Sequence, residues 1–149
     1  MCVEMATHAD VPAMTQLLEL LFQQEADFTP NREKQTRGLM LILDNPALGR
    51  LFVARRDGQL IGMVSLLWTV STAEGTLAAW LEDMVVHPAY RSQEIGSQLL
   101  QHAINAARKV GVRRITLLTD RDNLRARHFY QHHGFRLSAM IPLRLQLGE

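Results

Sequence analysis

The stretch that decides the fold is LEDMVVHPAYRSQEIGSQLL, residues 81–100. Its first half is apolar strand material that ends at Pro88, and its second half begins an amphipathic helix. The loop between them holds Arg91, Glu94 and Gly96. The leading N–H groups of a helix lack partners within the helix and carry the positive end of its dipole. This stretch therefore predicts an anion-binding turn, although the turn carries an acidic residue of its own.

Upstream of this stretch, the chain predicts an antiparallel meander. The strands LFVAR (51–55) and QLIGMVSLLW (59–68) flank Asp57-Gly58, a strong signal for a two-residue hairpin turn. A second turn, STAEGT, leads into the strand LAAWLEDMVV (77–86). Strands joined by such tight turns are antiparallel neighbours.

The N-terminal part predicts a short strand over residues 3–7 and two helices. Asp10 is expected to cap the first helix, with Pro12 just inside it, and the second runs from about Arg32 to Leu43. No internal repeat is present in the sequence.

Downstream, the helix that begins near Ile95 ends before Gly111. A strand at 114–119, a helix at 123–133 and strand material at 135–140 and 143–147 follow. The meander, a helical crossover and a parallel strand together predict an α/β fold with a mixed central sheet.

Composition favours a globular protein of one domain, residues 1–149. The net charge of +1 gives no general attraction to nucleic acid or to anionic membranes. The single cysteine, Cys2, fits a reducing compartment, and no apolar run reaches the length of a membrane span. We therefore expect a cytoplasmic protein with neither nucleic-acid nor membrane partners. The alternating strand at 143–147 is compatible with a homodimer.

Two nucleotide-binding motifs are excluded. The sequence has neither G-x-G-x-x-G after a strand nor G-x-x-x-x-G-K-[ST]. The sequence does contain a second informative stretch besides residues 81–100, namely NLRARHFYQHHGF (123–135). Together with the order of elements, the two resemble the GNAT superfamily of acyl-CoA-dependent N-acetyltransferases. The resemblance is strong over about residues 77–136, with a weaker similarity to diamine acetyltransferases around 81–100.

The resemblance implies that acetyl-CoA is the acyl donor and that no metal takes part. The family's pyrophosphate loop reads roughly [Q/R]-x-x-G-x-[G/A]; Arg91 and Gly96 fit its ends, and Glu94 stands where the first glycine is usual. A non-glycine residue can offer its N–H there when its φ is ordinary, and the carboxylate is expected to weaken the binding of pyrophosphate. The implied donor-binding residues are Val85, Val86, Arg91, Ser92, Gln93, Glu94, Ile95, Gly96, Ser97 and Asn123.

The resemblance also implies two catalytic residues. Glu82 would accept a proton from the amine, and strand alternation places it on one face with Met84 and Val86, with Asp83 on the other. Tyr130 would protonate the departing thiolate. The structural alternatives are a carboxylate at a strand end for Glu82 and a packed aromatic side chain for Tyr130. For Asn123 the alternative is a helix N-cap.

The acceptor side is expected in the loop after the first helix, where Glu25, Asp27 and Phe28 would attract a cationic amine. The histidines of 128–133 lack the cysteine or carboxylate that would complete a metal site. The resemblance thus implies acetyl transfer to a primary amine of a small molecule. The alternatives are a non-catalytic acyl-CoA-binding or regulatory domain and an acetyltransferase for protein lysines or N-termini.

Overall fold

The computed structural model describes residues 1–24, 30–91 and 94–148. The chain forms two compact units, residues 1–118 and 119–149, and each is described by itself.

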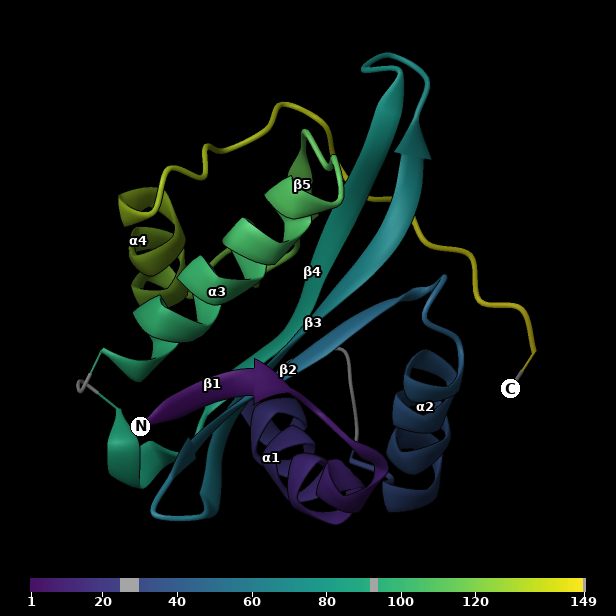
Figure 1. Ribbon diagram of the computed structural model, residues 1–149. Helices are drawn as coiled ribbons and strands as arrows, with labels where there is room; N and C mark the ends of the chain where they lie inside the picture. The colour runs from purple at the N-terminus through teal and green to yellow at the C-terminus, as the bar shows by residue number, and fades with distance from the viewer. Residues whose placement is uncertain (25–29, 92–93, 149) are drawn as a thin grey trace. The chain divides into compact units, whose positions relative to one another are not determined.

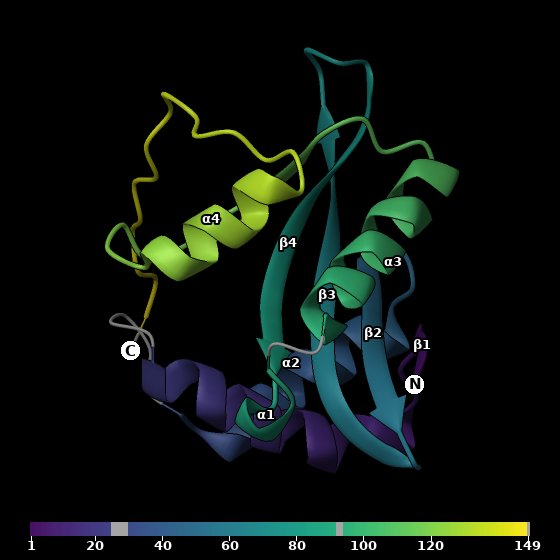
Figure 2. The same cartoon turned by 90° about the vertical axis from the view of Figure 1, so that its left-hand side faces the viewer.

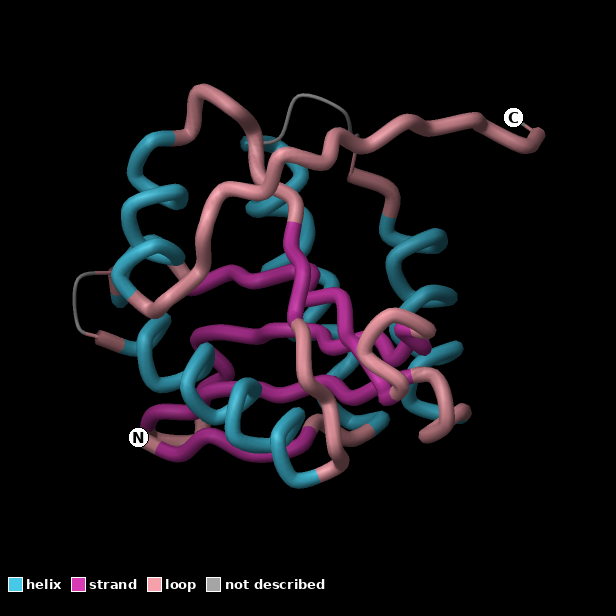
Figure 3. The backbone as a smooth tube through the Cα atoms, turned by 90° about the horizontal axis from the view of Figure 1, so that it is seen from above, coloured by secondary structure: helices cyan, strands magenta, loops and turns pink. Residues whose placement is uncertain are grey.

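The first unit is built on a five-stranded sheet in the order β1-β2-β3-β4-β5 (Figure 1). The first four strands are antiparallel neighbours and β5 lies parallel to β4, so the predicted mixed sheet is confirmed. The strands are β1 (Cys2–Met5), β2 (Gly49–Arg56), β3 (Gln59–Ser71), β4 (Thr76–Val86) and β5 (Ile115–Leu117). Figure 3 shows them side by side, seen from above.

The β2–β3 hairpin turns where the sequence predicts it. Asp57 and Gly58 both have positive φ, 52° and 77°, as the tight turn between twisted strands requires. Gly75, with φ of 69°, serves the next turn. Local turn chemistry therefore sets the register of the meander.

Helices cover both faces of this sheet. The helices α1 (Val11–Gln24) and α2 (Arg32–Asp44) lie on one face, and α3 (Ile95–Lys109) lies on the other (Figures 1 and 2). On the first face, Met63 and Val85 pack with residues of α1 in the hydrophobic core. On the second face, Gly62 allows the close approach of α3, because a Cβ there would lie 2.8 Å from Cδ1 of Leu99.

The start of α1 differs from the prediction. Asp10 is not the cap but the last residue of a short 3-10 turn, η1 (His8–Asp10), and its carboxylate accepts a hydrogen bond of 2.8 Å from the N–H of Thr7. Asp10 is buried and also meets Arg55 of β2 at 2.7 Å. The carboxylate therefore ties β2 to the start of the helix, a role that depends on a residue 45 positions away.

The second unit contains α4 (Leu124–His132), as predicted, but the strands expected at 135–140 and 143–147 are absent from the described part of the chain. A strand exists only when its backbone groups pair with a neighbour. In the structure Leu143, Leu145 and Leu147 are 83–91% exposed. The alternation of apolar and polar residues was thus a misleading signal for a strand here, because it indicates which side chains share a face and not whether a neighbouring strand is present.

Candidate active site

A β-bulge interrupts β4 at the residues where the sequence predicts the proton acceptor. Ser65 pairs with Glu82, and Met63 pairs with Val85, so three steps along β4 match two steps along β3. The extra residue is accommodated because Asp83 adopts a left-handed conformation, with φ of 53°. Asp is one of the few residues other than Gly that tolerate this conformation.

The bulge changes which side chains share a face. Residues directly opposite in a ladder project on the same side, so Glu82 shares the face of Ser65, and the next residue of β4 on that face is Val85. The predicted alternation of Glu82 with Met84 and Val86 is therefore wrong beyond the bulge. Asp83 was expected to face the other side, but its carboxylate accepts a hydrogen bond of 3.3 Å from the Ser65 hydroxyl.

The two carboxylates at the bulge differ in environment. Glu82 is exposed, whereas Asp83 is half-buried beside Ser65, which is 1% exposed. Burial, and then the charge of Glu82, raise the pKa of Asp83 to about 6, and the hydrogen bond from Ser65 opposes the increase. Sequence reasoning missed Asp83 as a functional candidate, because a bulge cannot be read from strand periodicity.

Beyond the bulge, one edge of β4 has no strand beside it in the described structure. The parallel ladder with β5 ends at the pair Leu81–Leu117, while β4 continues to Val86. The side chain of Val85 is 5% exposed and belongs to the core, so only its backbone can serve a ligand. The edge of residues 82–86 can therefore offer backbone N–H and C=O groups to an extended ligand, as the roles predicted for Val85 and Val86 require.

The loop before α3 explains why the family usually has glycine at the position of Glu94. Glu94 is the N-cap of α3 with φ of 63°, and its side chain makes no capping hydrogen bond. Left-handed backbone costs a non-glycine residue about 1–2 kcal/mol. The condition under which a non-glycine residue offers its N–H without strain, an ordinary φ, is thus not met at Glu94. This residue keeps the left-handed turn at a cost in strain that glycine would avoid.

The other described loop residues surround the start of α3. Arg91 and Glu94 are exposed, and the described residues contain no ion pair between them. Ile95 is 1% exposed and anchors the helix, whereas Gly96 and Ser97 are half-buried in its first turn. Ser92 and Gln93 lie outside the described residues, as do Glu25, Asp27 and Phe28 of the predicted acceptor loop.

The second unit holds the remaining two predicted residues. The side chain of Asn123 accepts a hydrogen bond of 3.1 Å from the N–H of Ala126, so the N-cap interpretation is confirmed. Its NH₂ group remains the part of the side chain that can donate to a ligand. The ring of Tyr130 packs at 5.2 Å from Phe129 and 5.6 Å from Phe135, and the residue is half-buried.

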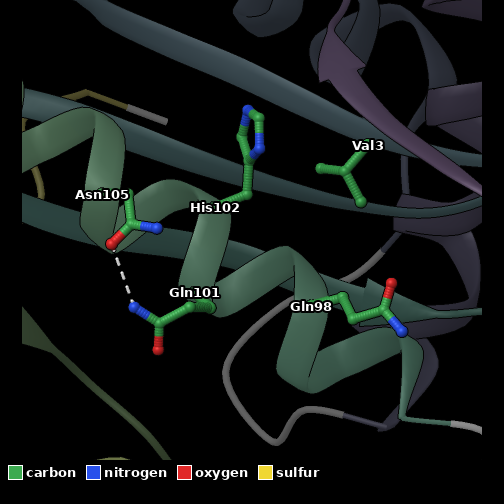
Figure 4. A pocket seen from close by; sticks show the side chains of 5 residues that line it. All are labelled: Val3, Gln98, Gln101, His102 and Asn105. Carbon is green, nitrogen blue, oxygen red and sulfur yellow. Dashed lines mark hydrogen bonds between the residues drawn. The ribbon is translucent and has the colours of Figure 1, made fainter.

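A separate hollow of about 430 Å³ lies along α3 and contains none of the predicted site residues (Figure 4). Gln101 donates a hydrogen bond of 3.1 Å to Asn105 at its rim. The lining is Val3, Gln98, Gln101, His102 and Asn105. In the described parts of the chain, no group of three or more His, Cys, Asp or Glu side chains is placed to hold a metal ion. No described helix has the length and apolar character needed to cross a membrane.

Comparison with known families identifies the chain. The model of the acetyltransferase (GNAT) family matches residues 11–135. The chain belongs to this family and is an enzyme of the acetyltransferase class, as the two sequence motifs predicted.

Relatives and solved structures agree with this assignment. The chain is 32% identical to the aminoalkylphosphonate N-acetyltransferase of Salmonella typhimurium, over 89% of this chain and 83% of that protein. It is 26% identical to the amino-acid acetyltransferase of Pasteurella multocida over 95% of its own length, but spans only 28% of that longer protein. A predicted acetyltransferase from Clostridium acetobutylicum, solved with acetyl-CoA, has the same fold, with a TM-score of 0.80, 18% identity and coverage of 97% and 95% of the two chains.

Proposed function

We propose that the protein transfers the acetyl group of acetyl-CoA to a primary amine of a small molecule, by direct attack of the amine on the thioester. The observation that carries the proposal is the combination of the β4 edge, residues 82–86, which has no neighbouring strand among the described residues, with a left-handed turn at Glu94 that starts α3. An extended arm ending in a pyrophosphate needs both features: backbone partners along its length and amide N–H groups at its anionic end.

The residues present fit acetyl-CoA as donor. In the proposed mode, the backbone of Val85 and Val86 binds the pantetheine arm, and the amide groups of 91–97 bind the pyrophosphate. Within this segment Glu94 contributes its backbone, while its charge opposes binding. The other residues proposed to bind the pyrophosphate are those predicted from the sequence: Arg91, Ser92, Gln93, Ile95, Gly96 and Ser97. Asn123 would donate to the arm through its NH₂ group, since its oxygen is engaged in the cap. Acetyl-CoA in the related fold from Clostridium acetobutylicum supports this assignment.

The chemistry requires a proton acceptor and a proton donor. The carboxylates at the β4 bulge are the candidates for the acceptor: Glu82, assigned from the sequence, and Asp83 beside it. Tyr130 is assigned as donor to the thiolate because the motif 123–135 matches the family signature in full. No metal is required in this scheme. Holding amine and thioester together supplies the remaining acceleration.

The names of the relatives guide the choice of acceptor. An aminoalkylphosphonate and an amino acid each join an amine to an acidic group. The loop residues Glu25 and Asp27, which are acidic, and the aromatic Phe28 instead favour a purely cationic amine such as a diamine. Both classes belong in any acceptor panel. Acetylation of protein lysines or N-termini is the remaining enzymatic alternative, and a non-catalytic acyl-CoA-binding module is disfavoured by family membership.

Two further predictions from the sequence stand as parts of the proposal. Cytoplasmic location rests on the lone, exposed Cys2. A homodimer remains compatible with the apolar segment 143–147, whose leucines are exposed. Light scattering of the purified protein measures its mass in solution and decides the second point.

Donor binding is the first test. Thermal unfolding with millimolar CoA, on protein treated with EDTA, should show a raised melting temperature, because a ligand that binds only the folded state stabilises it. An equal concentration of adenosine is the control for binding that does not use the pyrophosphate. No shift with CoA would contradict the proposed donor.

A further inference from the structure

We propose that Asp83 is the catalytic proton acceptor, and that Glu82 tunes it and attracts the amine. The proposal rests on the proposed function, because it assigns roles within the same reaction. It differs from the sequence-based assignment, in which Glu82 is the proton acceptor and Asp83 lies on the opposite face of the strand.

The geometry at the bulge distinguishes the two carboxylates. Asp83 is the extra residue of β4, held in a left-handed conformation, and its Oδ2 accepts a hydrogen bond from the Ser65 hydroxyl 3.3 Å away. That conformation is strained for a residue with a side chain, and such strain persists only where the surrounding structure maintains it. Asp83 also adjoins the unpaired edge of β4, where the proposed acyl donor would lie.

Burial and charge give Asp83 the properties of a base. The half-buried carboxylate has its pKa raised to about 6, so it holds a proton more strongly than an ordinary Asp yet is mostly ionised at neutral pH. Glu82 is exposed and shows no comparable environment. A purely structural carboxylate at this bulge would gain nothing from being buried next to a second negative charge.

The charged groups around Asp83 are few within the described residues. The neighbouring strands β3 and β5 carry no charged side chain. On the same face, α1 carries one, Glu19, which pairs with Arg32 at 2.9 Å. The titratable groups of α3 are His102, Arg108 and Lys109, on the helix that covers the opposite face of the sheet. Burial is therefore the main cause of the raised pKa of Asp83, and the charge of Glu82 adds to it.

The step balances as follows. The amine nitrogen forms a bond to the acetyl carbon as the C–S bond breaks, and the sulfur leaves with the bonding pair. The nitrogen of the ammonium form loses two protons. The carboxylate of Asp83 accepts the first, directly or through a water molecule, which frees the lone pair for attack, and the second leaves as the amide forms and balances the proton that the sulfur takes up. The thiolate takes up one proton, for which Tyr130 is the proposed donor. The exposed, acidic side chain of Glu82 favours the approach of the ammonium form of the acceptor.

The test is the pH dependence of kcat/KM from pH 5 to 9 for the wild type, Asp83→Asn and Glu82→Gln. The acceptor is whichever amine the wild type acetylates fastest among an aminoalkylphosphonate, the amino acids and a set of diamines. Asp57→Asn is the matched control, because Asp57 is also left-handed, with φ of 52°, and lies in the β2–β3 turn, outside the residues assigned to the site.

We expect kcat/KM of the wild type to decrease as the pH is lowered through an apparent pKa near 6. Asp83→Asn should lose roughly 10²–10⁴-fold in rate and lose this acidic limb, while still binding CoA in the thermal assay. Glu82→Gln should retain the limb but move it to lower pH, because the charge that raises the Asp83 pKa is gone. Asp57→Asn should behave as the wild type.

Two outcomes overturn the assignment. An active wild type with an Asp83→Asn variant of equal rate and unchanged limb removes Asp83 from the chemistry. Loss of the limb in Glu82→Gln alone would return the role to Glu82. A wild type that acetylates none of the amines contradicts the proposed function itself, which is a different result from an active enzyme that is indifferent to Asp83.

Discussion

The Ser65 hydroxyl and the Asp83 carboxylate meet at 3.3 Å across a β-bulge, on the face of the sheet that strand alternation assigned to Glu82. Asp83 is thereby half-buried and carries a pKa raised to about 6. A raised pKa means that the folded state favours the protonated acid, so ionisation of Asp83 costs stability.

The first prediction concerns this cost. Stability should fall as the pH rises from about 4 to about 6, the interval between the unfolded and folded pKa values of Asp83, and the loss should persist above it. Asp83→Asn should therefore be more stable than the wild type by up to about 3 kcal/mol at pH 8 and by less than about 1 kcal/mol at pH 4. Urea unfolding at both pH values measures the difference. Equal stability of Asp83→Asn and the wild type at pH 8 would show that the Asp83 carboxylate is well solvated. Asp57→Asn is the control for the effect of replacing a left-handed Asp by Asn.

The second prediction concerns Glu94. Glu94→Gly should relieve about 1–2 kcal/mol of left-handed strain against a cost of about 0.5–1 kcal/mol in chain entropy, so the free protein should gain up to about 1.5 kcal/mol. Glu94→Gln should keep the strain. Both should bind acetyl-CoA several-fold more tightly at low salt, and the gain should shrink as salt screens the charge. Calorimetric titration at two salt concentrations measures this, and equal affinities throughout would mean that the carboxylate points away from the phosphates.

The third prediction concerns Tyr130. Tyr130→Phe should lower kcat while leaving CoA affinity nearly unchanged, because the hydroxyl would act on the departing thiolate. The ring contacts with Phe129 and Phe135 should survive the change. Tyr90→Phe is the matched control, since Tyr90 is the other tyrosine of the chain and its hydroxyl meets Gln59 at 3.4 Å. Equal kcat for both variants, under conditions where chemistry limits turnover, would leave Tyr130 with a packing role only.

The fourth prediction concerns the link between β2 and the start of α1. Arg55 pairs with Asp10, whose side chain is 8% exposed, whereas the pair Arg32–Glu19 is more exposed. Arg55→Ala should cost about 2–3 kcal/mol at pH 7, and Arg32→Ala less than about 1 kcal/mol. The hydrogen bond from Arg55 lowers the Asp10 pKa, so this stability is present above the unfolded value of 3.8 and is lost as the pH falls through the lower folded value. Urea unfolding should show the gap between Arg55→Ala and the wild type narrowing in acid, and a constant gap would contradict the pairing.

Much of the fold could be predicted from the sequence because its signals are local. The Asp57-Gly58 turn fixes the hairpin, and Gly111 closes α3, since each acts through its own backbone. The C-terminal strands could not be predicted in this way, because the exposed Leu143 and Leu145 show the alternation without a pairing partner.

The candidate site was predicted less completely for the same reason. Its motif residues could be found by spacing, but the bulge at Asp83 depends on how β4 registers against β3, and strand alternation cannot reveal it. The left-handed φ of Glu94 is likewise a property of the folded turn. Asp83 and Glu94 both depart from the conformation and environment usual for their residue type. Asp83 is strained and half-buried, Glu94 is strained and places a negative charge at a proposed anion site, and both lie where a ligand is proposed to bind.

The central claim is that the protein moves an acetyl group from acetyl-CoA to a small-molecule amine. The most direct measurement is the release of free thiol from acetyl-CoA at pH 8 in the presence of an aminoalkylphosphonate, amino acids or diamines, with the acetylated amine quantified by mass spectrometry. The account predicts thiol release that depends on at least one of these amines, with one acetylated amine formed per thiol. Thiol release at the same rate without amine, or none with any of them from folded protein that binds CoA, would contradict it.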